Sequence, residues 1–207
     1  MSQAVTLFHM PRTCSLGPLI LLEELGAPYE LHVLDKARGE HRAPAYLAVN
    51  PLGKVPALRD AAGAVVTEQA AIMLHLADLH PAAGLAPPLG DPLRGPYLRW
   101  MLMYAGAFEP AVVDRAAGRD AGPRVMSPYG DFDALVNVIA GAVAPGPYLL
   151  GERFSAADVL WGTALGWTTQ FKLVPERPGI ADYVRRVGSR PAAQRARDRD
   201  AGLLAAG

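Results

Sequence analysis

Cys14 and Ser15 are the adjacent side chains of this sequence best suited to nucleophilic chemistry. They stand just before an apolar stretch, 16–25, that is typical of a helix, and the start of a helix lowers the pKa of a thiol and favours bonding of a hydroxyl to a thiolate. The residue three positions after Cys14 is Gly17, so a C-x-x-C pair and its dithiol chemistry are excluded. The alternative is structural, with Ser15 as an N-cap and Cys14 as a small, partly buried apolar residue.

Glu68 and Gln69 form a second candidate site, because they open an expected helix. The first turn of a helix presents backbone N–H groups without partners in the helix, and these favour anions. Glu68 can meet the ammonium group of a ligand, and Gln69 can donate to its carboxylate. Alternatively, Thr67 and Glu68 only cap the helix and complement its dipole. The two interpretations are compatible.

Composition limits the class of protein that carries these residues. The chain has 207 residues, of which 51% are hydrophobic and 19% charged, so it is expected to fold around a core. Its 20 basic and 20 acidic residues give no net charge and no basic surplus for nucleic acid. One cysteine excludes an intrachain disulfide. The first residues lack the pattern of a secretory signal, and no apolar run is long enough for a membrane span, so we expect a cytoplasmic protein without membrane contact.

The elements that must position these residues follow from hydrophobic periodicity and turn signals. The first part of the chain predicts the order β-α-β-β-β-α, with strands at 4–8, 29–34, 55–59 and 64–66 and helices at 16–25 and 68–80. One helical turn is expected within 44–49, and a hairpin turn at 60–63. The first strand, helix and strand have the length of a right-handed crossover.

Helices alone are expected after a stretch rich in Pro, Gly and Ala. The predicted ranges are 94–117, 129–143, 156–171, 180–186 and 191–204. We therefore predict an α/β domain at 1–80, a linker at 81–93 and an all-helical domain at 94–207. Ser155 and Asp158 form a capping-box pattern within the helical part, to which we assign a role in stability only.

Four motifs resemble those of the glutathione transferases, in the order in which that family has them. Residues 50–58, NPLGKVPAL, resemble the NP-x-G-x-VP-x-L signature, and 66–72, VTEQAAI, resemble its T-E-S-x-A-I block. Residues 12–16, RTCSL, resemble the start of the bacterial beta-class enzymes, and 150–158 resemble the L-x-G-x-x-x-[ST]-x-A-D motif. The resemblance covers about 6–191 and implies a thioredoxin-like first domain beside an all-helical bundle.

The resemblance implies a glutathione site in the first domain. The bond between Val55 and Pro56 is cis in thioredoxin-like folds, which turns the backbone of Val55 outward to pair with the cysteinyl part of glutathione; the alternative is an ordinary proline opening an edge strand. The γ-glutamyl group then meets Glu68 and Gln69, although the family more often has serine at position 69. His41 and Lys54 are the preferred cations for the glycyl carboxylate, with Arg38 in the same region.

Two roles at the sulfur stay open from the sequence. Ser15 can stabilise the glutathione thiolate through its hydroxyl, or Cys14 can form a mixed disulfide with glutathione. In the second domain the resemblance places Leu102 and Glu109 where the beta class has an asparagine and a histidine. Tyr104, Phe108 and Trp167 are candidates to line an apolar site for the electrophile, although each can instead belong to the core.

The expected function is conjugation of the glutathione thiolate to an electrophilic small molecule, a detoxification reaction, with glutathione as co-substrate. Glutathione-dependent disulfide reduction or peroxidase activity is the first alternative, and a binding or scaffold protein without turnover is the second. The resemblance implies a homodimer. The five histidines lack partners at metal-ligand spacing, so no metal is expected.

Overall fold

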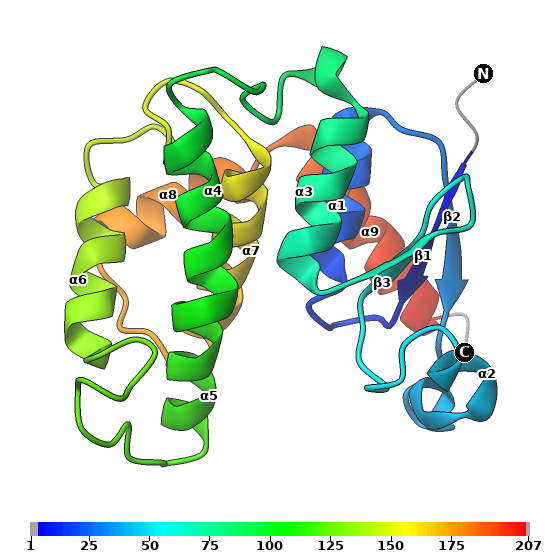
Figure 1. Cartoon of the computed structure of the whole chain (residues 1–207), viewed down its shortest axis with the longest axis horizontal. Coiled ribbons are helices and arrows are strands. Elements are labelled where there is room, and N and C mark those ends of the chain that lie inside the picture. Colours follow the sequence, from blue (N-terminus) through cyan, green and yellow to red (C-terminus); the bar gives the residue numbers. More distant parts are fainter. Residues whose placement is uncertain (1–3, 206–207) are drawn as a thin grey trace. The chain divides into compact units, whose positions relative to one another are not determined.

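A four-stranded sheet in the order β2-β1-β3-β4 forms the centre of the first part of the chain in the computed structural model, which describes residues 4–205 (Figure 1). The strands are β1 (Val5–His9), β2 (Tyr29–Val33), β3 (Ala57–Arg59) and β4 (Val65–Thr67). β1 pairs in parallel with β2 and antiparallel with β3, which pairs antiparallel with β4. This mixed sheet confirms the thioredoxin-like fold class.

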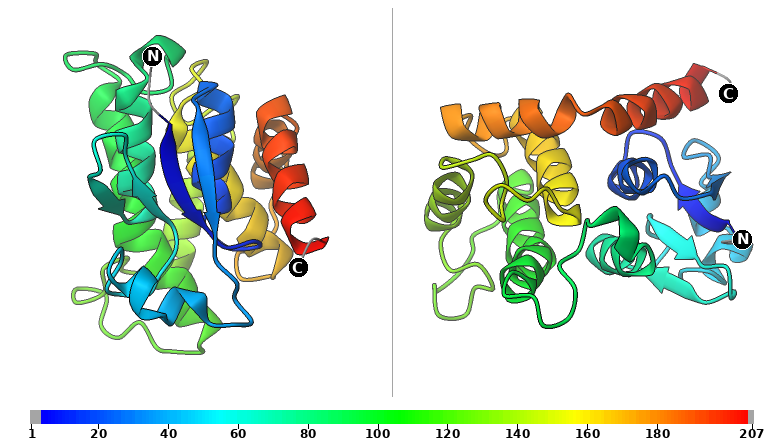
Figure 2. Two further views of the ribbon diagram at one scale, coloured as in Figure 1. Left: turned by 90° about the vertical axis from the view of Figure 1, so that its right-hand side faces the viewer. Right: turned by 90° about the horizontal axis from the view of Figure 1, so that it is seen from above.

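Helices α1 (Leu16–Leu25) and α3 (Gln69–Leu79) lie on one face of this sheet (Figure 2). Leu19, Leu21 and Leu22 of α1 are buried, and the helix ends at Gly26, whose φ of 60° suits glycine. Between β2 and β3 the chain forms a short 3₁₀ turn, η1 (Glu40–Arg42), and the four-residue helix α2 (Pro44–Leu47).

The start of α3 differs from the expected one. Thr67 is the last residue of β4 and not the N-cap, and Glu68 takes the cap position with a φ of 68° and without a capping hydrogen bond from its side chain. A positive φ is uncommon for a residue other than glycine. This backbone turns the chain sharply from β4 into α3, so the helix begins one residue later, at Gln69.

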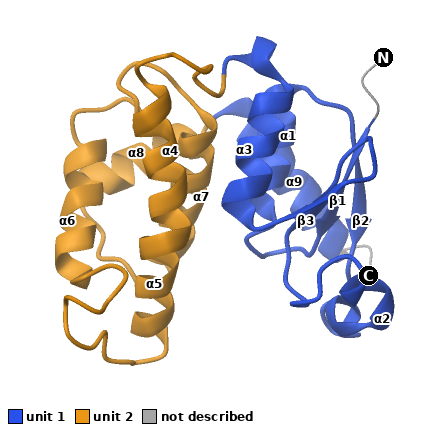
Figure 3. Ribbon diagram, viewed as in Figure 1, with its two compact units in different colours: residues 1–84, 190–207 blue, residues 85–189 orange. Residues whose placement is uncertain are grey.

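Helix α9 (Pro191–Ala205) packs against α1, although it is the last element of the chain (Figure 2). Ala192, Ala193 and Ala196 are the small, buried residues of this helix. Contacts divide the chain into a first unit of residues 1–84 and 190–207 and a second unit of residues 85–189 (Figure 3). The residues from 190 onward therefore group with the sheet, whereas the sequence analysis assigned them to the helical domain. The domain ranges expected from the sequence, 1–80 and 94–207 with a linker at 81–93, stay a prediction.

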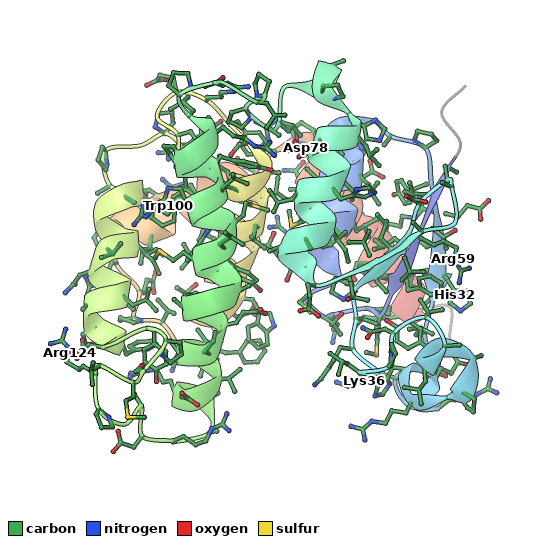
Figure 4. All side chains as sticks on the ribbon, in the orientation of Figure 1. His32, Lys36, Arg59, Asp78, Trp100 and Arg124 are labelled. Carbon is green, nitrogen blue, oxygen red and sulfur yellow. The ribbon has the colours of Figure 1, made fainter. Side chains whose placement is uncertain are left out.

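The second unit is helical, as expected. After η2 (Pro81–Ala83) of the first unit, it comprises α4 (Arg94–Met103), the π-helical segment η3 (Tyr104–Phe108), α5 (Glu109–Ala116), α6 (Phe132–Val143), α7 (Ala156–Gln170) and α8 (Pro178–Gly188). Trp100, labelled in Figure 4, lies in its core against Trp161, whose indole N–H donates to the carbonyl of Trp100 at 2.9 Å. The π-helical segment directly precedes Glu109-Pro110, where the proline has no N–H for a regular helical ladder.

The capping box at the start of α7 is present as predicted. The buried carboxylate of Asp158 accepts from the backbone N–H of Ser155 at 2.9 Å and from its hydroxyl at 3.0 Å. It also accepts from the N–H of Leu149 and the hydroxyl of Tyr183, at 2.8 and 2.9 Å. One side chain thereby ties three segments of the helical unit.

Candidate functional site

Cys14 lies in the turn between β1 and α1, and its side chain is exposed. Its Sγ donates to the carbonyl oxygen of Val55 at 3.1 Å. The bond between Val55 and Pro56 is cis, as the sequence predicted, and Pro56 directly precedes β3. The fold thus brings the only thiol of the chain to the backbone of the residue that was expected to bind an extended peptide.

Ser15 occupies a different environment from its neighbour. Its side chain is wholly buried, and its Oγ accepts from the N–H of Met10 at 3.1 Å. The same oxygen lies 2.8 Å from Nδ1 of His9 and 2.8 Å from Oγ1 of Thr13. The N-cap hydrogen bond considered for Ser15 is also absent. Its hydroxyl is therefore engaged inside the first unit, and Cys14 is the residue of the pair that solvent reaches.

The loop before Val55 is held by its own polar groups. Buried Asn50 donates from Nδ2 to the carbonyl of Lys54 at 2.8 Å and accepts from the N–H of Leu52 at 3.1 Å. The hydroxyl of Tyr46 donates to the same Lys54 carbonyl at 2.5 Å. Burial raises the pKa of Tyr46 to about 12, so its hydroxyl stays protonated and continues to donate.

His41 and Lys54 are brought near each other by Gly53. Gly53 has a φ of 61°, and a Cβ built on it would lie 2.9 Å from the carbonyl oxygen of His41, so the two segments approach closely only with glycine. The side chain of Lys54 is exposed. Nδ1 of His41 is buried without a hydrogen-bond partner among the described residues, and a buried polar atom of this kind calls for a ligand or water.

Gln69 is buried at the first turn of α3, next to exposed Glu68. A Cβ on Gly17 of α1 would collide with Nε2 of Gln69. Glycine at position 17 therefore gives the amide of Gln69 its place between α1 and α3. This explains how the longer glutamine fits where the family more often has serine.

The candidates for the electrophile site lie in two separate places of the second unit. Tyr104 and Phe108 are buried in its core, where their ring centroids lie 6.0 and 5.0 Å from that of Trp161. Trp167 is 50% exposed and pairs with Phe171, which is 57% exposed, at 4.8 Å. Leu102 is also exposed, whereas Glu109 accepts from the hydroxyl of Tyr104 at 3.0 Å. That Tyr104, Phe108 and Trp167 line an electrophile site stays a prediction.

A hollow of about 290 Å³ elsewhere in the second unit contains none of these residues. Two of its guanidinium groups are engaged with neighbours: Arg119 lies 3.1 Å from Asp114, and Arg115 stacks on Phe132. Within residues 4–205, histidine, cysteine and carboxylate side chains form no group of three that could hold a metal. In the same part of the chain no helix is long and apolar enough to cross a membrane.

Two buried polar residues of the first unit were missed by sequence reasoning. His9 at the end of β1 had been noted only as one of five scattered histidines, and Asp200 on α9 had no assigned role. Nε2 of His9 lies 3.0 Å from Oδ1 of Asp200, and Nδ1 of the same ring contacts Ser15. No sequence signal joins residues so far apart along the chain.

The comparisons with known proteins agree with this fold. The family of the glutathione S-transferase N-terminal domain matches residues 12–79. The chain is 32% identical to the glutathione S-transferase GstA of Escherichia coli O157:H7, over 91% of this chain and 94% of that protein. The chain therefore belongs to the glutathione S-transferase family.

Two further relatives show the range of the family. The disulfide-bond oxidoreductase YfcG of Escherichia coli K12 is 27% identical over 84% of this chain and 85% of its own. The structure of a sphingomonad glutathione S-transferase complexed with glutathione is 31% identical, with a TM-score of 0.78, over 95% of this chain and 98% of that one.

Proposed function

We propose that this chain is a glutathione transferase, in which the first unit binds glutathione and its thiolate attacks an electrophilic small molecule. The sulfur forms a new bond to the electrophilic carbon, and a leaving group departs with the electron pair of the bond that breaks. In this assignment the cysteinyl part pairs with the backbone of Val55 beside Pro56. The γ-glutamyl group lies at Glu68 and Gln69, and the glycyl carboxylate at His41 and Lys54.

The contrast between Cys14 and Ser15 carries the proposal. The exposed Sγ of Cys14 lies 3.1 Å from the carbonyl of Val55, whereas the hydroxyl of Ser15 is buried among Met10, Thr13 and His9. A ligand paired with Val55 would therefore place its sulfur next to Cys14. We assign to Cys14 the hydrogen bond to the glutathione thiolate, and to Ser15 a role inside the turn.

Single substitutions at the two positions test this assignment. Glutathione affinity by calorimetry and conjugation of 1-chloro-2,4-dinitrobenzene are measured for Cys14→Ala and Ser15→Ala. We expect Cys14→Ala to lower kcat at least tenfold while the thermal midpoint changes little, and Ser15→Ala to lower the thermal midpoint. Full activity of Cys14→Ala with loss of activity in a well-folded Ser15→Ala would return the role to Ser15. No binding at millimolar glutathione would favour a scaffold without turnover.

Disulfide reduction is the second candidate, because the exposed lone thiol of Cys14 suits it and because YfcG is named a disulfide-bond oxidoreductase. One glutathione cleaves a disulfide RSSR to give GSSR and RSH. Cys14 then attacks the glutathione sulfur of GSSR, releases the second RSH and holds glutathione as a mixed disulfide. A second glutathione releases GSSG, so two glutathione molecules supply both electrons. Loss of disulfide reduction but not of conjugation in Cys14→Ser would identify this route.

The assembly, location, type of electrophile and biological role that we propose rest on the resemblance to the family. We propose that the protein acts as a homodimer in the cytoplasm, that the electrophile is apolar, and that the reaction serves detoxification. Light scattering on the purified protein tests the dimer: a mass of about twice 22.0 kDa is expected, and a monomer at micromolar concentration would contradict it.

A further inference from the structure

The C-terminal helix α9 is fastened to α1 and β2 by charged side chains. Arg190, directly before α9, binds both carboxylate oxygens of Glu24, at 2.6 and 2.8 Å. Arg195 lies 2.8 Å from Glu23, and Arg199 stacks over the ring of Tyr29. These contacts fix the helix along the outside of the first unit, and they leave Asp200 facing the end of β1.

Asp200 is the one buried carboxylate of the described part of α9, and it reaches the turn that carries Cys14. Both of its oxygens accept from the backbone N–H of Arg12, each at 3.3 Å. Arg12 has a φ of 57°, a left-handed conformation that is costly for a residue with a side chain. The carboxylate from α9 thus stabilises the strained residue two positions before Cys14.

His9 continues the chain of contacts from Asp200 to Ser15. The ring is wholly buried, with Nε2 3.0 Å from Asp200 and Nδ1 2.8 Å from the hydroxyl of Ser15. The three residue types are those of a hydrolytic triad, but the buried hydroxyl has no access to a substrate. Ser15 instead closes the turn, because it accepts from the N–H of Met10 and lies 3.1 Å from the carbonyl of the same residue.

The contacts of the His9 ring depend on its protonation state. In neutral His9, a proton on Nε2 would face Asp200, and Nδ1 would accept a hydrogen bond from the hydroxyl of Ser15. Protonated His9 donates to Ser15, whose hydroxyl then turns to the carbonyl of Met10. Two charged side chains act on His9: Asp200 favours the protonated ring, and Arg199 opposes it. On the neighbouring strand β2, His9 pairs with Val33, which carries no charge. Burial is the largest effect and lowers the pKa of His9.

We propose that His9 and Asp200 are positioning residues, through which the docking of α9 sets the conformation of the turn from Met10 to Ser15 and thereby the reactivity of Cys14. The role of that reactivity in catalysis rests on the proposed function. The contacts themselves do not involve glutathione. Undocking of α9 would release the N–H of Arg12 and the ring of His9 together, and the thiol would leave its place beside Val55.

The single cysteine makes the test direct, because alkylation by iodoacetamide in the folded protein reports on Cys14 alone. Rates are measured from pH 5 to 9 for wild type, Asp200→Asn and His9→Gln. Asp198→Asn is the matched control, since Asp198 is an exposed carboxylate on the same helix. We expect Asp200→Asn to change the rate at least threefold, and His9→Gln to remove an inflection of the wild-type profile below neutral pH. Asp198→Asn should follow wild type.

Identical rates and identical pH profiles for wild type, Asp200→Asn and His9→Gln would overturn the proposal. If a variant does not fold, amide hydrogen exchange in the wild-type protein tests the proposal instead. The N–H groups of Met10 and Arg12 should lose protection together with those of α9 as the pH falls from 7.5 to 5, after correction for intrinsic exchange. Unchanged protection would overturn the proposal. Failure of wild type to bind glutathione would end the proposed function and leave these two measurements valid.

Discussion

Asp158 in the helical unit and Asp200 on α9 are both buried carboxylates, but their partners differ in kind. Asp158 accepts four hydrogen bonds, all from uncharged donors: two backbone N–H groups and two hydroxyls. Asp200 faces a histidine and the strained backbone of Arg12 beside the candidate site. The first arrangement joins segments of one fold, whereas the second lies beside the candidate site. We therefore expect substitutions around Asp158 to affect stability, and substitutions around the site to affect function.

The two regions should also respond to pH with opposite signs. Burial raises the pKa of Asp158, so the part of the stability that depends on its protonation is present at pH values below the ordinary pKa and is lost as the pH rises through the folded-state value. Burial lowers the pKa of His9, so its contribution is present above the ordinary value and is lost as the pH falls through the folded-state value.

The largest effect is expected for Asp158→Ala. The substitution leaves the N–H groups of Leu149 and Ser155 and the hydroxyl of Tyr183 buried without their acceptor. We expect a loss of roughly 3 kcal/mol or more in the free energy of unfolding, measured by urea denaturation. Asp182→Ala, which removes an exposed carboxylate of α8, is the control and should change it by less than about 0.5 kcal/mol. Equal losses of unfolding free energy in Asp158→Ala and Asp182→Ala would contradict the structural role of Asp158.

Gly17→Ala is a change in the candidate site, and unlike Asp158→Ala it is expected to weaken ligand binding more than stability. The added methyl group would displace the amide of Gln69, while alanine is favoured over glycine in a helix by about 1 kcal/mol. We expect roughly tenfold weaker glutathione binding by calorimetry, as for loss of one hydrogen bond to a charged group, with little loss of stability. A variant that binds glutathione as wild type does would show that Gln69 makes no contact with the ligand.

His9→Gln should flatten the pH dependence of stability. In the wild type, the free energy of unfolding is expected to fall as the pH is lowered from 7 through the folded-state pKa of His9, because burial lowers that pKa. The variant keeps an N–H donor for Asp200 but does not titrate. Parallel pH curves for the two proteins would show that His9 does not titrate differently in the folded state.

The smallest effect concerns the surface ion pairs. Arg190→Ala breaks a two-bond contact with Glu24, whose carboxylate is only 7% exposed, whereas Arg185→Ala breaks the pair with Asp182, which is 53% exposed. We expect a loss of about 1 kcal/mol for the first and less than about 0.5 kcal/mol for the second, by thermal or urea unfolding. The reverse order would contradict the assignment of α9 as a fastened part of the first unit.

The residues that sequence reasoning placed correctly are those whose signals are local. The helix over 16–25, the hairpin and the capping box of Ser155 and Asp158 each depend on neighbours within a few positions. The cis bond at Pro56 followed from the family motif. Contacts between distant segments gave no signal, which is why His9 and Asp200 were missed and why the sequence alone left the roles of Cys14 and Ser15 open. The positive φ of Glu68, which delays α3 by one residue, also has no mark in the sequence.

A crystal structure of the protein soaked with glutathione tests the central claim most directly. We expect the cysteinyl backbone of glutathione to pair with Val55, its γ-glutamyl carboxylate to lie at Gln69, and its sulfur to contact Sγ of Cys14 in place of the Val55 carbonyl. The hydroxyl of Ser15 should keep its contacts with Met10 and His9. A sulfur bound to Oγ of Ser15, or glutathione bound away from Val55, would contradict the account.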